Sequence, residues 1–287
     1  GEIPEHTDHL FVVSRRHQYL GRVAVSSLLI RDPLTPINEL IDDEQPAIPV
    51  NTDANQVATQ FSDYDWITAP VVDENNILLG RITIDDVVDI IREQAEHQAM
   101  GAAGLDEDED LFSPVPRAAK RRALWLGINL LTAFLASWVI GRFEATLQQV
   151  VALAVLMPIV ASMGGVAGTQ VLTLMVRGIA LGQVGVGNLR ALIAKEAMVG
   201  VLNGVVWAVV VGVVCALWFQ DTKLGLVIAG AMTINLVAAA LAGVLVPITL
   251  KRMNIDPALA GGVVLTTFTD VIGFLSFLSL GTLILLK

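Results

Sequence analysis

The sequence predicts a multi-domain membrane protein: a small α/β soluble region, a connecting helix and an all-α transmembrane domain of five helices. With 54% hydrophobic residues and a mean hydropathy of +0.65, the chain is too apolar for an ordinary soluble protein. Residues 1–116 carry 23 acidic and 6 basic side chains, whereas residues 117–287 carry 5 and 12. This asymmetry indicates two regions with different solvents, and the soluble region also contains an internal repeat.

The repeat is a strand–turn–strand–helix unit that occurs twice in the soluble region. The first copy runs from Leu10 to Ile30 and begins its second strand at Gly21-Arg22, and the second copy has Gly80-Arg81 at the matching place. Between the copies we expect a helix from Thr52 or Asp53 to about Ser62. Asp53 suits the N-terminal turn of that helix, where a carboxylate can accept hydrogen bonds from free backbone N–H groups.

The second copy, and above all its segment Gly80-Arg-Ile-Thr-Ile-Asp-Asp86, resembles the cystathionine β-synthase (CBS) domain, a regulatory module that usually occurs in pairs. The resemblance implies that the first copy is incomplete, and we expect the chain to be part of a longer protein. It also implies that Thr83 and Asp86 hold the ribose of an adenine nucleotide such as ATP. Ala24 and Ser27 occupy those places in the first copy, and a purely structural or dimer-forming pair is an equal alternative.

Acidic side chains crowd the soluble region. Many like charges raise the energy of a compact arrangement, and divalent cations would relieve that repulsion. A solvated acidic surface is the alternative interpretation. The side chains concerned are Asp42, Asp43, Glu44, Asp53, Asp63, Asp65, Asp73, Glu74, Asp85, Asp86 and Asp89.

A connecting segment joins the two regions. A helical pattern continues from Asp89 through Met100 and is expected to stop at Gly101 or Gly104. The acidic run Asp106–Asp110 is expected to be a mobile linker, and the prolines that follow it forbid a continuous helix. We therefore expect a soluble domain over residues 1–91, a connecting helix and linker over 92–122 that can lie beneath a pore mouth, and a transmembrane domain over 123–287.

Hydropathy predicts five membrane spans, and the bilayer is therefore one partner of the chain. The second span contains Met163-Gly-Gly-Val-Ala-Gly-Thr-Gln170, where we expect a bend or break. Two interpretations remain open: small residues that let helices approach closely, or a broken helix that exposes carbonyl groups to an ion. The expected spans cover residues 123–141, 147–176, 191–218, 225–249 and 258–286.

Basic residues set the expected orientation, because they concentrate on the side of the membrane that holds the soluble region. By the positive-inside rule, this region is cytoplasmic and the C-terminus lies outside. Two polar side chains within the spans, Asn203 and Asn235, are expected to form interhelical hydrogen bonds.

Asp270 is the main candidate functional residue. It lies near the middle of the last span, where an ionised carboxylate is unfavourable unless it meets water, a cation or a partner. Thr266, Thr267 and Thr269 add hydroxyl oxygens just before it, and such oxygen ligands suit a hydrated alkaline-earth cation. The alternative is that Asp270 forms a hydrogen bond to a neighbouring helix and has only a structural role.

Three segments of the membrane region, Pro158 to Gln170, Lys195 to Gly204 and Asp256 to Asp270, are similar to the MgtE family of magnesium transporters. The resemblance covers essentially the whole chain. It implies a homodimeric, Mg²⁺-selective channel in the plasma (inner) membrane, whose cytoplasmic domains close the pore when internal magnesium is high.

The resemblance also implies roles for individual residues. Asp270 corresponds to the pore aspartate that holds a hydrated Mg²⁺ ion. Asp256 and the soluble residues Asp53, Asp65, Asp86 and Asp89 correspond to ligands of regulatory Mg²⁺. The pore-lining candidates are Thr266, Thr267, Thr269, Gly262, Gly165 and Thr169.

The sequence departs from the family pattern at several positions. Gln94, His97, Gln98 and Asn55 stand where carboxylates are usual, and Val166 stands where the glycine motif commonly has Asn. Fewer anionic ligands weaken a cation clamp. We therefore expect gating that is less sensitive to Mg²⁺ than is usual for the family, or gating set by another signal such as a nucleotide.

Two other classes of function fit the sequence less well. An ion-coupled secondary transporter for other divalent metals (Mn²⁺, Co²⁺), with nucleotide sensing by the CBS pair, would use Asp270 as a relay, but no inverted repeat is visible in the spans. An enzyme is not expected, because no span holds a second acid or a histidine and Cys215 has no cysteine partner. Nothing in the sequence indicates a nucleic acid partner.

Overall fold

The computed structural model describes residues 7–105, 112–185 and 187–286, and it divides the chain into two compact units. The first unit extends to Ala95 and the second begins at Glu96. The acidic run Asp106–Asp110 lies outside the described residues. The boundary that we expected between residues 91 and 92 falls within one continuous helix, α3 (Ile84–Ala102), which passes from the first unit into the second.

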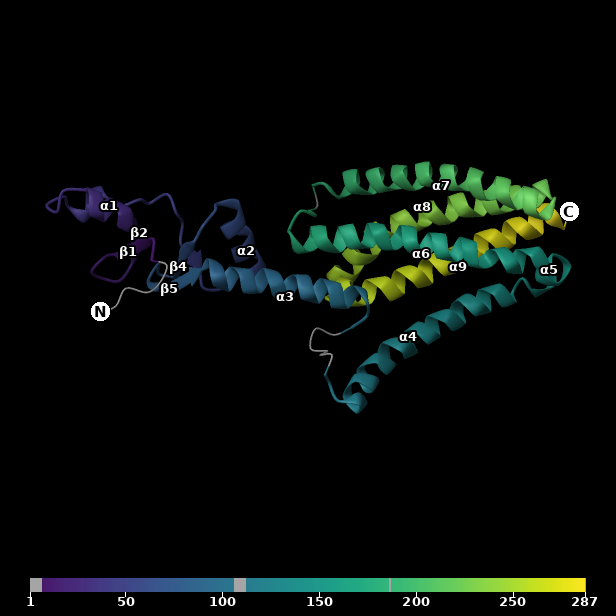
Figure 1. Ribbon diagram of the computed structural model, residues 1–287, viewed down its shortest axis with the longest axis horizontal. Helices are drawn as coiled ribbons and strands as arrows, with labels where there is room; N and C mark the ends of the chain where they lie inside the picture. Colours follow the sequence, from purple (N-terminus) through teal and green to yellow (C-terminus); the bar gives the residue numbers. More distant parts are fainter. Residues whose placement is uncertain (1–6, 106–111, 186, 287) are drawn as a thin grey trace. The chain divides into compact units, whose positions relative to one another are not determined.

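The first unit is an α/β domain (Figure 1). Two strands form one sheet, in which β1 and β2 are antiparallel, and three form a second, in the order β3-β4-β5. Its elements, before α3, are β1 (His9–Val13), β2 (Tyr19–Ala24), α1 (Val25–Ile30), the 3-10 helix η1 (Ile37–Glu39), β3 (Ile48–Pro49), α2 (Ala54–Asp63), β4 (Thr68–Val72) and β5 (Leu78–Thr83).

The internal repeat is visible in the register of the two hairpins. Val12 pairs with Gly21 in the first, and Val71 pairs with Gly80 in the second. In both hairpins the register shifts immediately after the valine, so the two copies share the same irregularity. The shared register confirms the repeated unit predicted from the sequence.

Helix α2 begins where the sequence indicated. Asp53 is its N-cap, and its side chain accepts a hydrogen bond from the backbone N–H of Asn55 at 2.9 Å. The buried face of α2 contributes Phe61, whose ring packs edge-on against Trp66 with ring centroids 5.8 Å apart. The core of the second copy forms around this pair and the buried Val87 of α3.

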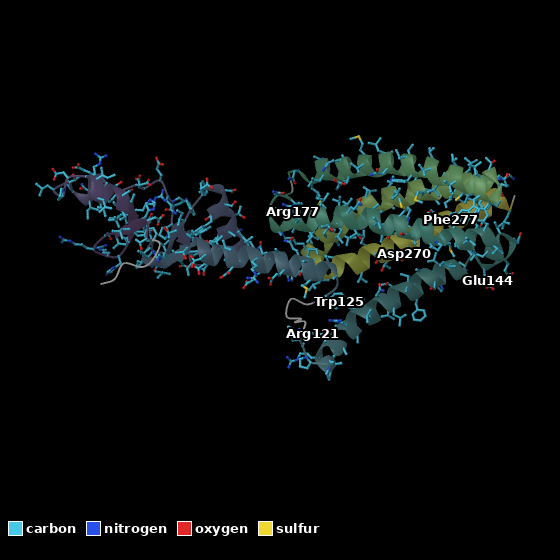
Figure 2. The ribbon with its side chains drawn as sticks, in the orientation of Figure 1. Arg121, Trp125, Glu144, Arg177, Asp270 and Phe277 are labelled. Atoms are coloured by element: carbon cyan, nitrogen blue, oxygen red, sulfur yellow. The ribbon has the colours of Figure 1, made fainter. Side chains whose placement is uncertain are left out.

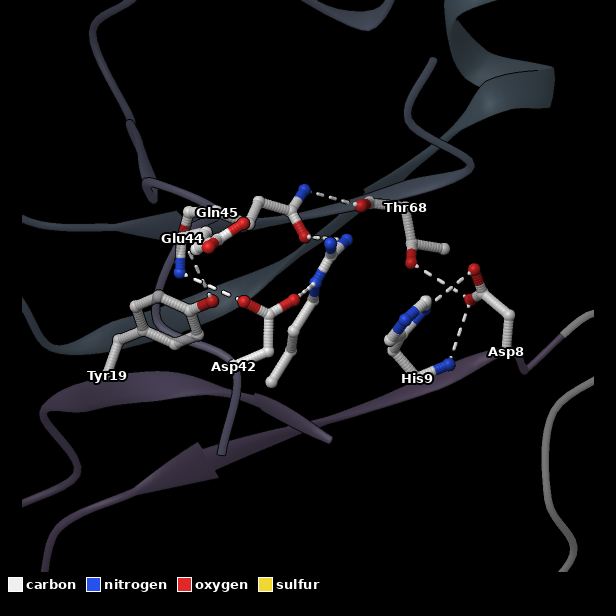
Figure 3. A network of polar contacts seen from close by, with 8 residues as sticks. Asp8, His9, Tyr19, Asp42, Glu44, Gln45 and Thr68 are labelled. Atoms are coloured by element: carbon white, nitrogen blue, oxygen red, sulfur yellow. Dashed lines mark hydrogen bonds and ion pairs between the residues drawn. The ribbon is translucent and has the colours of Figure 1, made fainter. Parts of the chain in front are cut away.

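A polar network joins the two copies (Figure 3). Arg22 Nη1 donates to Gln45 Oε1 at 2.7 Å, and Gln45 Nε2 donates to the carbonyl oxygen of Thr68 at 2.9 Å. Arg22 Nε also donates to Asp42 Oδ2 at 2.9 Å, and this hydrogen bond holds the pKa of the Asp42 carboxyl below its usual value. Because Gln45 is buried, its amide depends on these partners.

The second unit is all helical. Five of its helices are long and apolar enough to cross a membrane, which confirms the five expected spans. The second span begins later than predicted, because a short helix, α5, precedes it. The helices after α3 are α4 (Val115–Gly141), α5 (Glu144–Gln149), α6 (Val151–Ala180), α7 (Leu189–Phe219), α8 (Thr222–Arg252) and α9 (Pro257–Leu285).

Helix α8 is the centre of the second unit and packs against α6, α7 and α9. Glycines let the backbones approach closely: a Cβ atom at Gly225 would lie only 2.6 Å from the carbonyl oxygen of Gly212 on α7. Further along α8, a Cβ atom at Gly243 would lie 2.6 Å from Cβ of Val171 on α6. Substituting a larger residue at either glycine would separate the helices.

Helix α6 runs without interruption through Met163–Gln170, so the expected break is absent. The glycines of this segment divide between two faces instead. Gly164 and Gly168 are buried, and a Cβ atom at Gly168 would lie 3.0 Å from a methyl carbon of Leu265. Gly165 has no atom near its Cβ position. Close packing therefore explains the buried glycines, since a continuous helix keeps its backbone groups paired inside the membrane.

We predict that Arg22→Ala destabilises the first unit by about 1–3 kcal/mol, because it leaves the buried Gln45 amide and the Asp42 carboxylate without their partner. Hydrogen exchange measured by mass spectrometry on the full chain in detergent would show faster exchange in β2 and β4. Arg16→Ala, which removes an exposed arginine of the same unit, is the matched control. Equal exchange in the two variants would contradict a role for the network.

Candidate functional site

Asp270 is half-buried on α9 and lies between the two ends of the helical unit, with Arg177 near one end and Glu144 near the other (Figure 2). Within the described residues, no hydrogen bond or ion pair reaches its carboxylate. The expected structural alternative, an interhelical hydrogen bond from Asp270, is therefore not formed in this chain. A carboxylate at this depth needs a partner from water, a cation or another chain.

Residues at four-residue intervals give α9 two different stripes. One stripe is buried and packs on the neighbouring helices; it contains Gly261, Leu265, Thr269, Gly273, Phe277 and Gly281. The adjacent stripe is half-buried and contains Gly262, Thr266 and Asp270. Because a helix turns once every 3.6 residues, side chains four apart share a face, and Asp270 therefore shares a face with the Thr266 hydroxyl.

The threonine hydroxyls are positioned by their own helix. Thr266 donates to the carbonyl oxygen of Gly262 at 3.0 Å, and Thr267 donates to that of Val263 at 2.6 Å. Thr269 donates to the carbonyl oxygen of Thr266 at 3.0 Å and is completely buried. A hydroxyl that donates its hydrogen inside the helix keeps its lone pairs as acceptors, which suits contact with the water shell of a cation.

Two hollows border the half-buried stripe. A cavity of about 510 Å³ lies between the end of α3, α4, α6 and α9, and its wall includes Arg122, Trp125, Thr169, Gly262 and Thr266. A groove of about 620 Å³ runs over α6 and is lined by Gly165, Val166, Thr169 and Thr266 among others. The structure thus brings Gly165, Thr169, Gly262 and Thr266 to the walls of these hollows, whereas Thr267 and Thr269 line neither.

Asp256 lies at the start of α9 and contacts the end of α3. Its Oδ1 caps α9 by accepting from the backbone N–H of Ala258 at 2.8 Å, and its Oδ2 lies 2.6 Å from Nε2 of His97. Next to this pair, a Cβ atom at Gly101 would come within 3.1 Å of the Ala258 backbone. In the sequence His97 stands out only as a departure from the usual carboxylate, and no pattern there predicts this contact.

The predicted regulatory acids of the first unit are not gathered into one site. Asp53, Asp65, Asp86 and Asp89 are all exposed, and Asp53 already caps α2. Among the described residues, no group of three or more histidine, cysteine, aspartate or glutamate side chains is close enough to share a metal ion. Regulatory Mg²⁺ binding by these residues remains a prediction.

Thr83 and Asp86 contact each other at the start of α3. The carboxylate of Asp86 accepts hydrogen bonds from the Thr83 hydroxyl at 3.0 Å and from the Thr83 backbone N–H at 3.2 Å. The bond from the Thr83 N–H is one half of a capping box, in which the third helical residue reaches back to the residue before the helix. The pair therefore has a structural role whether or not it also binds a nucleotide.

Comparison with known proteins identifies both parts of the chain. Residues 157–280 match the family model of MgtE, described as a divalent cation transporter, and residues 37–93 match that of the CBS domain. The second unit is therefore similar to the MgtE family over residues 157–280, and the first unit is similar to a CBS domain over residues 37–93. MgtE proteins are membrane cation transporters and not enzymes, in agreement with the absence of a catalytic pair from the sequence.

Curated relatives named magnesium transporter MgtE extend the MgtE match over nearly the whole chain. The protein of Bacillus subtilis is 31% identical over 283 residues, and that of Thermus thermophilus is 31% identical over 280 residues. These alignments cover 98% and 96% of this chain but only 62% of each relative. The structure of the cytosolic domain of the Mg²⁺ channel MgtE in complex with ATP is 32% identical over 30% of this chain and 35% of that one, with a TM-score of 0.29.

We predict that Thr83→Val lowers the stability of the first turn of α3 by about 0.5–2 kcal/mol, because the substitution removes the hydroxyl that donates to the Asp86 carboxylate. Hydrogen exchange at residues 83–88 of the full chain, without nucleotide, would measure the effect. Thr59→Val is the matched control, since its hydroxyl is exposed and bonds only to its own helix. Unchanged exchange in α3, combined with weaker ATP binding, would assign the Thr83 hydroxyl to nucleotide binding instead of capping.

Proposed function

We propose that this protein conducts Mg²⁺ across the plasma (inner) membrane as a homodimeric channel, with Asp270 of each subunit at the ion path. The observation that carries the proposal is the half-buried Asp270 carboxylate, which has no hydrogen-bond or ion-pair partner among the described residues and lies in an MgtE domain. A cation in its water shell supplies the missing partner, and carboxylate and hydroxyl oxygens suit Mg²⁺.

In this proposal a second copy of the chain packs against the open face of α6. Val166 is 57% exposed there, and it lines the groove together with Gly165, Thr169 and Thr266. One chain offers a single mid-span carboxylate, which is a small ligand set for a divalent cation. A two-fold axis along this face would bring two copies of Asp270 to one path, as the isologous interface of a homodimer does.

Gating is proposed to act through α3, with the CBS domains in the cytoplasm and the C-terminus outside. The end of α3 contacts α9 through His97 and Asp256 and contributes to the wall of the cavity beneath it. In this proposal the exposed acids of the first unit respond to Mg²⁺, and ATP bound near Thr83 and Asp86 is a further candidate signal. The direct contact between His97 and Asp256 supports a gate that depends less on Mg²⁺ than in relatives with a carboxylate at this position.

We predict that Asp270→Asn reduces Mg²⁺ flux into proteoliposomes by at least about tenfold or abolishes the preference for Mg²⁺ over Na⁺, because it removes the charge but keeps the side-chain size. The flux of the unmodified chain should need no proton gradient. Glu144→Gln is the matched control, since Glu144 is an exposed acid outside the bundle interior.

Two results would contradict the channel proposal. If Mg²⁺ flux and its selectivity are unchanged in Asp270→Asn, Asp270 has only a structural role. Flux that requires a proton gradient would favour an ion-coupled transporter for divalent metals.

We predict that His97→Glu makes gating more sensitive to internal Mg²⁺ by about tenfold. Two carboxylates then face each other at Asp256, so they repel at low Mg²⁺ and hold a shared cation at high Mg²⁺. Flux measured against internal Mg²⁺ concentration would show a higher maximum and inhibition at lower concentration. Ala99→Glu adds the same charge at an exposed position on the same turn, and an equal shift in that control would show that the effect is only general charge.

A further inference from the structure

Asn235 is a completely buried amide at the centre of the membrane helices. It belongs to α8, the helix that packs against α6, α7 and α9. Asn203, the other asparagine that the sequence analysis grouped with it, is exposed on α7. The two residues looked equivalent in the sequence, but only Asn235 lies where several helices meet.

The amide makes one directional contact. Asn235 Nδ2 donates to the carbonyl oxygen of Val160 on α6 at 2.8 Å, and this hydrogen bond links α8 to α6 within the described residues. Its Oδ1 is buried and has no hydrogen-bond partner there. An unpaired buried acceptor is unfavourable. An apolar side chain of similar size would therefore give a more stable fold if packing were the only role of this position.

Two glycines make room for this amide. A Cβ atom at Gly164 of α6 would overlap Asn235 Nδ2, and a Cβ atom at Gly273 of α9 would lie 2.8 Å from the same nitrogen and 3.1 Å from Cγ. The side chain therefore fills the space where α6, α8 and α9 come closest. A shift of α6 or α9 along its axis would break the hydrogen bond or force a backbone into the amide.

Both glycines lie next to residues of the proposed ion path. Gly273 follows Asp270 by about one helical turn, which is roughly 5 Å along the axis. Gly164 directly precedes Gly165, which lines the groove on α6. The position along the helix axes at which Asn235 holds α6 and α9 therefore sets the position of Asp270 relative to the open face of α6.

We propose that Asn235 is a positioning residue for ion conduction: its amide fixes α6 and α9 in register on α8, and so places Asp270 opposite the groove on α6. This inference rests on the proposed channel function. The other glycine contacts between these helices, such as that of Gly168 with Leu265, are apolar and non-directional. The hydrogen bond to Val160 adds the directional element that such contacts lack.

The test compares single and double variants of the full chain in proteoliposomes. Asn235→Ala is expected to reduce Mg²⁺ flux about tenfold, the change that corresponds to about 1.4 kcal/mol, and to lower the ratio of Mg²⁺ to Ca²⁺ flux. Gly273→Ala alone should cause a similar loss, because the added methyl group overlaps the amide. The double variant should show no loss beyond that of Asn235→Ala, since removal of the amide vacates the space that the methyl group needs but leaves the hydrogen bond to Val160 unmade.

Controls separate positioning from folding and from the channel proposal itself. Asn203→Ala should leave flux and the melting temperature unchanged. If Asn235→Ala lowers the melting temperature but leaves the Mg²⁺ to Ca²⁺ ratio intact, or if the double variant regains the flux of the unmodified chain without the amide, Asn235 has only a packing role and the inference is overturned. Equal Mg²⁺ flux in the unmodified chain and in Asp270→Asn would instead overturn the channel proposal. The Asn235 variants alone cannot give that result.

Discussion

Close approach of helix backbones around α8 is the constraint on which the membrane unit depends. Lipid tails are as apolar as leucine side chains, so helices gain little from burying apolar surface against each other and must associate through tight packing and directional bonds. The glycines provide that packing: Gly225 meets the Gly212 carbonyl on α7, and Gly243 meets Val171 on α6. These contacts hold α7 and one side of α6 against α8, and Gly273 of α9 meets Asn235 of α8 in the same way. The other side of α6 is open to the groove.

The division into a packed side and an open side explains how one helix serves structure and ion chemistry together. On α9 the buried stripe through Leu265, Thr269 and Gly273 carries the packing, and the adjacent stripe presents Thr266 and Asp270. The stripes are one residue apart in sequence, about 100° around the helix. Because Asp270 is outside the packed stripe, its carboxylate has no hydrogen-bond or ion-pair partner among the residues that the structure describes, and this leaves it available to a cation.

Sequence patterns predicted the elements better than their contacts. Five spans and the repeated hairpin follow from hydropathy and from the Gly-Arg pairs, since both depend on local composition. The predicted break in α6 was wrong because glycine permits either an irregular backbone or close packing. Which of the two occurs depends on the neighbouring helix. The contact between His97 and Asp256 joins residues far apart in the chain, so no periodicity could reveal it. The sequence predicted Asp270 together with nearby pore-lining candidates. The structure separates Thr266, which shares the half-buried face of Asp270, from Thr269, which is buried in the packing.

In the first unit, residues that we expected to bind ligands already have structural partners. Asp53 caps α2, and Asp86 caps α3 through Thr83. A cation or nucleotide that binds these carboxylates must share or replace their backbone contacts, so binding there would act directly on the helix ends. For α3 the consequence extends along a single helix, because the turn capped by Asp86 and the turn that holds His97 belong to the same element. A ligand at the first turn can thus change the stability of the helix whose last turns contact Asp256 and the Ala258 backbone.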